Sequence, residues 1–377
     1  VPYIETPKDQ FMIWLMHSRA EWLPATGLWD SLLLPILADS DEWLTAKNKS
    51  FGSAPGPSNV QAGLIGRAPL RFQKSVLRLF NLWLKAEIGS NAKIASILHI
   101  AKGEAYLGKE RPITLAESLI RVFYAIIAAR IQVVVEDWRG CYVDEDGVKQ
   151  RSTDGKRATG IFSPLQFAFQ SGKSSTTPMT TTKAALQSAL YQAAKYLDMT
   201  NASKRVKQFL HLLFIDWMKM YDSVGYPGMQ ISLRARGMEP QHVALMLEVH
   251  YQATRFSLGP TGDSDLLLMQ ACLAQGMPDA CSQANVFLEP IARLLECYSH
   301  SMTCGAPIKG SCFADDATPL SDNRSDMDEM TAGIGRFSRS RNVSLESSKS
   351  AYLTVAIDSG DGGALRYKVF EPLRLTI

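Results

Sequence analysis

The chain has 377 residues, of which 46% are hydrophobic and 20% charged, and this composition is typical of a globular protein. Its length exceeds the size that one hydrophobic core usually serves, so we expect two subdomains. The net charge of +3 is too small to indicate a nucleic-acid-binding protein by itself.

The first part of the chain is predicted to be helical. Residues 1–46 form an aromatic-rich region whose tryptophans we expect to pack against the body of the protein: Trp14, Trp22, Trp29 and Trp43. The Gly, Pro and Ser residues of 47–60 indicate a linker. Residues 117–138 place their apolar side chains on one helical face and predict a strong helix.

Later segments alternate between helices and strands. The polar residues of 141–160 indicate an exposed hairpin or loop. Amphipathic patterns predict helices at residues 179–200, 240–253, 283–300 and 322–340. Helices and hairpins in irregular order indicate an α+β fold and argue against a doubly wound sheet.

Membrane insertion and secretion find no support in the sequence. No apolar run approaches the ~20 residues that cross a bilayer, and Glu5, Lys8 and Asp9 interrupt any signal-peptide core. The six cysteines form neither a Cys-x-x-Cys pair nor an array with histidine, which argues against structural zinc. Their scatter in apolar surroundings indicates reduced, buried thiols. We therefore expect an intracellular protein, in the nucleus or the mitochondrion.

The segment Phe313-Ala314-Asp315-Asp316 is the most informative of the chain. Apolar positions on both sides of the acidic pair predict a strand, a tight turn and a second strand. Because two carboxylates at one turn repel each other, a cation is expected to neutralise them. Mg²⁺ prefers such oxygen ligands, and Mn²⁺ is the alternative ion. A solvated turn without a metal would also explain this tetrapeptide when it is taken alone.

A second acid, Asp216, ends the apolar strand predicted from Leu212. A lone carboxylate there is costly to bury unpaired, so we expect it to meet Asp315 and Asp316 around shared metal ions. Two such metals can activate an attacking hydroxyl and stabilise a leaving pyrophosphate. Capping of the following helix is the alternative, and it explains Asp222 better than Asp216.

Together these two segments resemble motifs A and C of reverse transcriptases, and further blocks follow in the family's order between residues 50 and 355. Gln275-Gly276-Met277-Pro278, with the apolar helix after it, resembles motif B. Arg111–Leu115 and residues 166–176 are similar to two blocks of the fingers, and residues 54–58 to the additional N-terminal finger block of non-LTR retrotransposon enzymes. The resemblance is therefore closer to the non-LTR branch than to the retroviral enzymes.

This resemblance implies a right-hand polymerase fold with fingers and a palm, in which helices flank an antiparallel palm sheet. It divides the chain into an N-terminal helical extension (1–50), fingers (51–200) and a palm (201–377). Few residues follow Lys349, so we expect the thumb to be absent or truncated.

The resemblance also implies catalytic roles for individual residues. Asp216 and Asp315 would ligate both metals, with Asp316 adjacent. Lys349 resembles the lysine that protonates the leaving pyrophosphate, although a surface lysine is the simpler interpretation. Tyr221 would exclude the 2′-hydroxyl of a ribonucleotide, unless it is an ordinary core aromatic.

The remaining nucleotide contacts are expected from the fingers and from motif B. Lys102 and Arg111 resemble the cations that grip the triphosphate, Arg as a planar fork and Lys as a mobile point charge. Gln275 and Gly276 would border the nascent base pair. Cations gathered between Arg67 and Arg111 form either a phosphate-facing wall or a solvated helix face.

The function that this resemblance implies is an RNA-directed DNA polymerase that extends a primer with dNTPs. Its partners would be an RNA template, a DNA or RNA primer, and a protein or ribonucleoprotein complex, without a membrane. Motif B departs from the family pattern at Asp279, Ala280 and Gln283, and this departure affects how the template strand is expected to be contacted.

Three other functions remain open. A template-dependent RNA polymerase would share the palm and the metals, but Tyr221 argues against it. A catalytically inert reverse-transcriptase-like scaffold or RNA-binding subunit is favoured by the altered motif B and disfavoured by the intact aspartates. A telomerase-type enzyme would need a dedicated RNA-binding domain, which the sequence does not indicate.

Overall fold

The structure is a computed structural model. It describes residues 27–49, 54–101, 110–139, 141–143, 148–151, 160–170, 172–199, 207–251, 253–259, 262–269, 271–298, 300–301, 307–308, 310–357 and 365–370.

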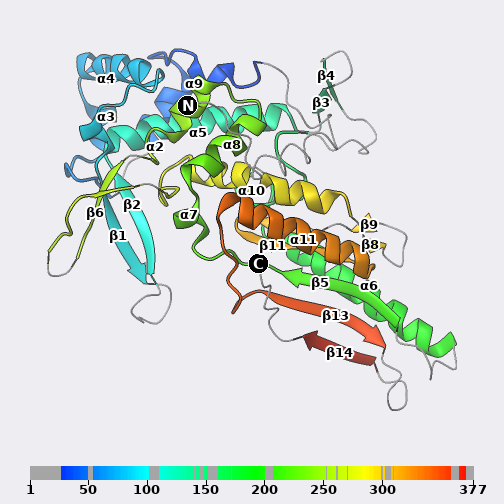
Figure 1. The fold of residues 1–377 in the computed structure, drawn as a ribbon. Helices are drawn as coiled ribbons and strands as arrows, with labels where there is room; N and C mark the ends of the chain where they lie inside the picture. Colours follow the sequence, from blue (N-terminus) through cyan, green and yellow to red (C-terminus); the bar gives the residue numbers. More distant parts are fainter. Residues whose placement is uncertain are drawn as a thin grey trace.

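Helix α5 (Ser118–Asp137) is the centre of the helical end of the molecule (Figure 1). Its side chains Ile120, Phe123 and Ile127 are fully buried, which confirms the helix predicted over residues 117–138. Shorter helices of the N-terminal part lie around it: η2 (Asp30–Leu33), α2 (Asp41–Lys49), α3 (Gly63–Arg67) and α4 (Leu70–Trp83).

By length and composition α5 could also cross a membrane, so the expectation that no segment approaches such a span is wrong for this helix. However, 61% of its most apolar window is buried inside the protein. The helix is apolar on most sides because neighbouring elements cover it, and this coverage is typical of a core helix.

Two of the four N-terminal tryptophans confirm the expected packing against the body. Trp29 and Trp43 are buried, and Trp43 meets Phe80 of α4 edge-on at 6.0 Å between ring centroids. The Trp29 indole Nε1 donates to the carbonyl oxygen of Arg236 at 2.6 Å. Trp14 and Trp22 lie outside the described residues.

A mixed sheet extends from the helical end, in the order β2-β1-β6-β7. Strand β1 pairs with β2 antiparallel and with β6 parallel, while β6 and β7 are antiparallel. The short helix η3 leads into β1. The bounds of these elements are η3 (Ser90–Lys93), β1 (Ala95–Ala101), β2 (Glu110–Ala116), β6 (Thr254–Ser257) and β7 (Leu267–Leu268).

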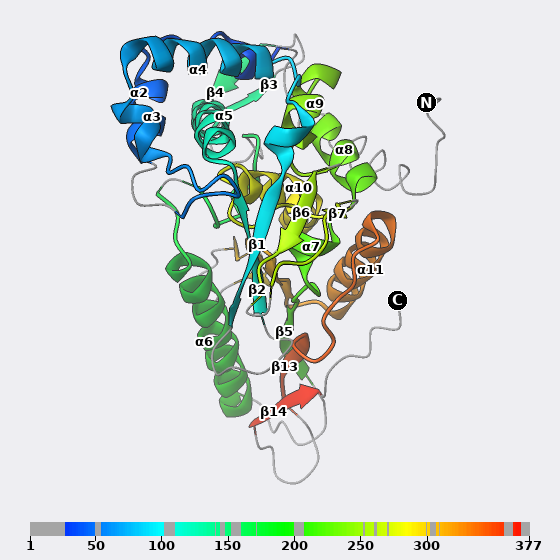
Figure 2. The ribbon, with the colours of Figure 1, turned by 90° about the vertical axis from the view of Figure 1, so that its left-hand side faces the viewer.

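A second, wholly antiparallel sheet forms the opposite end, in the order β12-β5-β13-β14. Figure 2 shows its strands β5 and β13 between helices α6 and α11. Ala185, Ala189 and Ala193 let α6 lie close against the sheet, where they share a small apolar cluster with Leu212 and Val355. The bounds are β12 (Leu320–Ser321), β5 (Lys207–Phe214), β13 (Ala351–Ile357), β14 (Leu365–Phe370), α6 (Thr176–Met199) and α11 (Arg324–Arg341).

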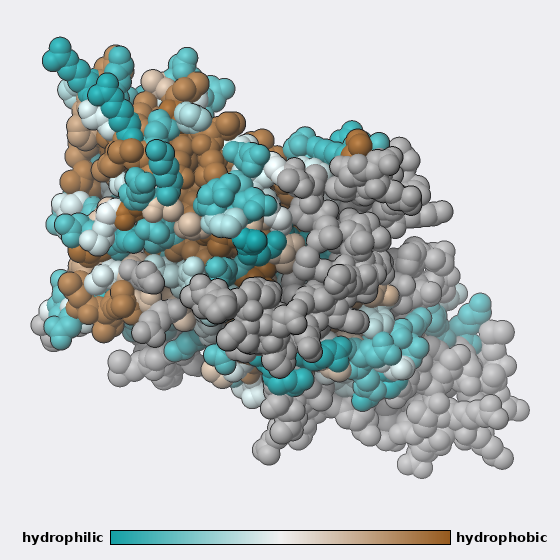
Figure 3. All heavy atoms as spheres, turned by 45° about the horizontal axis from the view of Figure 1, so that its top comes forward, coloured by the Kyte–Doolittle hydropathy of each residue, from teal (hydrophilic) through white to brown (hydrophobic). Residues whose placement is uncertain are grey.

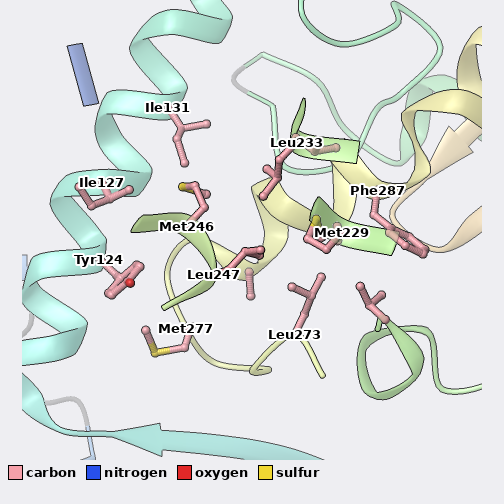
Figure 4. Packing of buried hydrophobic residues seen from close by; sticks show 14 of the residues in the cluster. Tyr124, Ile127, Ile131, Met229, Leu233, Met246, Leu247, Leu273, Met277 and Phe287 are labelled. Carbon is pink, nitrogen blue, oxygen red and sulfur yellow. The ribbon is translucent and has the colours of Figure 1, made fainter. Parts of the chain in front are cut away.

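Helix α10 (Ala280–Glu296) lies between the two ends, and most of its side chains are buried. Figure 4 shows Phe287 of α10 in one apolar cluster with Tyr124, Ile127 and Ile131 of α5. Short helices and hairpins complete the described fold: α7 (Met220–Ser223), α8 (Tyr226–Ala235), α9 (Pro240–Leu247), β3 (Cys141–Val143), β4 (Lys149–Arg151), β8 (His300–Ser301), β9 (Pro307–Ile308), β10 (Ser311–Phe313) and β11 (Asp316–Thr318).

The combination of helices with a mixed and an antiparallel sheet agrees with the α+β prediction. Two expectations were wrong. Helix α9 ends at Leu247, short of the expected residue 253, and the chain then turns so that His250 enters the interior. Cys297 is exposed at the end of α10, so the thiols are not uniformly buried.

A buried cluster of charged side chains anchors α10 to the segment around Ser163. Arg293 donates from Nε to Glu289 Oε1 at 2.6 Å and lies 3.4 Å from the carboxylate of Glu296, and all three residues are buried. Glu289 Oε1 also accepts from the Ser163 backbone nitrogen at 2.7 Å. Arg236 lies 3.8 Å from the same carboxylate oxygen. Two cations and two anions therefore neutralise each other while they hold the segment around Ser163.

We predict that Arg293→Met destabilises the protein by about 3–5 kcal/mol, because it removes the one cation that contacts both buried carboxylates and leaves their negative charge only partly compensated. Chemical denaturation followed by circular dichroism measures this free energy. The control Arg139→Met removes a partly exposed pair with Glu136 and should cost less than about 1 kcal/mol. Equal costs for the two variants would show that the cluster contributes no more than a surface pair.

Candidate active site

Backbone pairing brings the acidic segments together. Ile215, just after β5, and Ala317 of β11 exchange two antiparallel hydrogen bonds of 2.9 and 3.2 Å. In this register the next residue of one strand, Asp216, lies opposite the preceding residue of the other, Asp316. The expected meeting of the two segments is therefore observed in the backbone.

The acidic pair itself lies on the predicted strand–turn–strand. Phe313 pairs with Asp316 at the ends of β10 and β11, and Ala314 and Asp315 form the turn between them. Ala314 adopts a left-handed backbone with φ of 54°, which a small side chain tolerates better than a branched one. The turn leaves Asp315 half-buried and Asp316 exposed.

The three carboxylates are close enough to repel one another. Partial burial raises the pKa of Asp316 above its ordinary value, and the negative charges of Asp315 and Asp216 raise it further, while Lys349 opposes the shift. Such mutual repulsion marks a place where an added cation would be stabilised.

Lys349 is the cation that meets these carboxylates in the structure. Its Nζ donates to Asp216 Oδ2 at 2.8 Å, and this hydrogen bond raises the pKa of Lys349. The loop that carries it is held against the strand end, because the Glu346 nitrogen donates to the Asp216 carbonyl at 2.8 Å. The structure therefore places the predicted Lys349 at the site.

The donor set fits a hard divalent cation, since the three side chains offer oxygen atoms and none of them is fully buried. They do not form a preassembled metal cluster: no three His, Cys, Asp or Glu residues in the described ranges converge closely enough to hold an ion. Asp216 would have to exchange the ammonium of Lys349 for the metal.

Tyr221 lies on α7, one helical turn beyond the Asp216 strand end. Its hydroxyl is 4.0 Å from Cys281 Sγ at the start of α10. Burial raises the pKa of Tyr221, and the nearby Cys281 and Asp315 raise it further. The ring thus lies partly buried close to Cys281 and near the charge of Asp315. Asp222 lies within α7 and does not cap it, so the capping alternative for that residue was wrong.

The turn that contains Gln275 and Gly276 contacts strand β2. The Thr114 nitrogen donates to the Gln275 carbonyl at 2.6 Å. Gly276 has a φ of 102°, and a Cβ there would lie 2.9 Å from the Thr114 carbonyl oxygen, so only glycine fits. Arg111 lies exposed on the same strand. Lys102 lies outside the described residues.

The departures from motif B face the interior of the protein, and how the template strand is contacted stays a prediction. Asp279 and Gln283 are fully buried. Asp279 Oδ2 accepts from Gln283 Nε2 at 2.7 Å and from His250 Nε2 at 3.0 Å. A buried carboxylate needs such partners, and a polar side chain at position 283 supplies one of them.

The described residues of the block at 166–176 pack beside the acidic hairpin formed by β10 and β11. The Phe167 nitrogen donates to the Cys312 carbonyl at 2.9 Å, and Asn285 of α10 donates to the Ala168 carbonyl at 2.8 Å. Lys173 donates to the Gln166 carbonyl at 2.8 Å. Burial and the charge of Arg139 lower the pKa of Lys173 to about 8.

Several residues of this region escaped the sequence analysis: His250, Glu289, Arg293 and Glu296. For the last three of these residues, the sequence offered one signal, which was the presence of charged side chains in a helix expected to be buried. Glu289, Arg293 and Glu296 recur at spacings of four and three along an otherwise apolar stretch, which marks a partner on the same helix. The partners of His250 lie 24 and 29 residues away and leave no local pattern.

Acidic side chains that meet on paired strands beside Lys349 are compatible with an enzyme that transfers phosphoryl groups. A comparison with protein families is in accord: the model of the reverse transcriptase (RNA-dependent DNA polymerase) family matches residues 100–363. The chain belongs to this family. A search of curated proteins found no match.

We predict that Lys173 makes stability rise with pH. Its folded pKa of about 8 lies below the ordinary value of 10.5, so between these values the unfolded chain binds more protons and unfolding is disfavoured as pH increases. Lys173→Met should reduce the gain in unfolding free energy between pH 7.5 and 10 by about 1 kcal/mol, a value discounted for partial solvent exposure.

Urea denaturation at the two pH values measures this gain, and the wild-type and variant proteins share all other titrating groups. Lys85→Met, which removes an exposed lysine, should leave the gain unchanged. The interpretation fails if Lys173→Met has the wild-type pH profile.

Proposed function

We propose that this chain is an RNA-directed DNA polymerase of the non-LTR retrotransposon type, which extends a primer with dNTPs. The observation that supports it most is the pairing of Ile215 with Ala317, which lies inside the family match and places Asp216 beside Asp315 and Asp316.

The three aspartates would hold Mg²⁺, or Mn²⁺ in its place. When bound, the metal would activate the primer hydroxyl and stabilise negative charge on the phosphates. In the structure Lys349 forms an ion pair with Asp216. Once displaced from that carboxylate, its ammonium remains within the site and can donate a proton to the leaving pyrophosphate.

Nucleotide selection is assigned to the residues around the motif B turn. Arg111 on β2 would bind the triphosphate through its planar guanidinium. Gln275 and Gly276 would border the nascent base pair, since the close approach of Gly276 to Thr114 holds the turn against β2. The ring of Tyr221 would occupy the space that a 2′-hydroxyl needs, which favours dNTPs over ribonucleotides.

An acid-free stretch of the chain supports RNA as the partner. Between Glu42 and Glu87 the sequence contains seven lysines and arginines and no acid. Arg71, Lys74 and Arg78 are exposed along α4, with Phe72 and Leu82 exposed beside them. Figure 3, which looks onto this end, shows hydrophilic side chains standing on a largely apolar surface. Cations interleaved with an aromatic ring suit phosphates and unpaired bases.

The proposed activity predicts primer extension on an RNA template with Mg²⁺ and dNTPs. Asp315→Ala/Asp316→Ala should lower the rate by about a thousandfold or more, because removal of charge stabilisation at a reacting phosphate has effects of this size. Ribonucleotides supplied in parallel should be incorporated far more slowly than dNTPs.

Glu87→Ala, which removes an exposed acid at the helical end of the molecule, is the matched control and should extend normally. Faster use of ribonucleotides would instead indicate an RNA polymerase. If the folded wild-type chain extends no primer, the inert scaffold or RNA-binding subunit becomes the better account.

A further inference from the structure

Three buried side chains form a polar trio at the start of α10. His250, Asp279 and Gln283 are each fully buried. Asp279 Oδ2 accepts from both of the others, and Gln283 Nε2 also donates to the Met246 carbonyl at 2.7 Å. A buried carboxylate is costly, so this arrangement needs an explanation beyond the packing of α10.

The second ring nitrogen of His250 reaches the motif B turn. The Ala274 backbone nitrogen, which can only donate, lies 3.1 Å from His250 Nδ1. Nδ1 must therefore be the acceptor, and the ring proton lies on Nε2, where it is donated to Asp279. Asp279 thus selects the tautomer that Ala274 requires.

The turn is held from three directions. The Leu273 nitrogen donates to the Tyr221 carbonyl at 2.7 Å, and the Gln275 carbonyl accepts from the Thr114 nitrogen at 2.6 Å. These two bonds join the turn to α7 and to the strand that carries Arg111. His250 holds the residue between them from the interior. Figure 4 shows Leu273 and Met277, which flank the turn, among buried apolar side chains. Apolar packing therefore holds the two flanking residues, and the polar trio holds the backbone between them.

We infer that His250, oriented by Asp279, is a positioning residue for the nucleotide-binding turn at residues 274–277. The pair fixes the Ala274 N–H and with it the place of Gln275 and Gly276 between Tyr221 and Arg111. The inference rests on the proposed function for its consequence, which is that loss of the Ala274 bond weakens dNTP binding more than it slows chemistry.

Two substitutions at position 250 test the two hydrogen bonds of the imidazole ring separately. In His250→Asn the amide oxygen takes the place of Nδ1, which retains an acceptor for Ala274 and removes the donor to Asp279. In His250→Gln the amide reaches the position of Nε2, which retains the donor to Asp279 and removes the acceptor for Ala274. Both place a polar amide in the same buried site, so a purely structural role predicts similar effects.

We expect His250→Gln to raise the KM for dNTPs about tenfold with kcat nearly unchanged, the effect of one lost hydrogen bond. His250→Asn should stay within about threefold of wild type. Asp279→Asn, which keeps an acceptor for Nε2, should resemble wild type, whereas Asp279→Leu should resemble His250→Gln.

Hydrogen exchange of the peptide that covers residues 271–279, measured without nucleotide, gives a readout independent of turnover. Exchange should be faster in His250→Gln than in His250→Asn at matched thermal stability. Equal exchange and equal KM in the two variants, or changes that follow the melting temperature alone, would overturn the inference. An inactive wild type would refute the proposed function, while the exchange contrast would still decide whether His250 holds the turn.

Discussion

Two backbone hydrogen bonds between Ile215 and Ala317 determine where the acidic side chains of this protein lie. The bonds are short-range and directional, so they hold Asp216 opposite Asp316 even though the carboxylates repel each other. The positive charge of Lys349 offsets this repulsion, and its loop is hydrogen-bonded to the same strand end through the Glu346 nitrogen. The fold therefore keeps three carboxylates together with one ammonium, a balance that a divalent cation can take over.

Helix α10 connects the region of the acidic hairpin to distant segments of the chain through polar contacts. Asp279, directly before its first turn, binds His250, which in turn contacts Ala274, and Asn285 within the helix binds the segment beside the acidic hairpin. Its last turns hold the buried ion cluster of Glu289, Arg293 and Glu296. From Asn285 onward, these polar groups contact residues 160–168, so one helix sets the position of that segment relative to the acidic hairpin.

The acidic hairpin was predictable because its information is local. The apolar residues on both sides of Asp315 and Asp316 predict a strand, a turn and a second strand. Asp216 was identified because it is an acid at the end of an apolar strand. The ion cluster and the His250 contact were not predictable, since their bonds to Ser163 and Ala274 join segments far apart in the sequence. The hydrogen bond from Gln283 to Asp279 was not predictable either, because the sequence does not indicate that both polar side chains are buried.

The central claim is that the paired strands form a cation site built from Asp216, Asp315 and Asp316. Crystals grown with Mn²⁺ and examined by anomalous diffraction test it most directly. The account predicts an anomalous peak within bonding distance of Asp216 and Asp315, with the Lys349 ammonium displaced from Asp216. The absence of a peak there, with Lys349 still bound to Asp216 at saturating Mn²⁺, would contradict it.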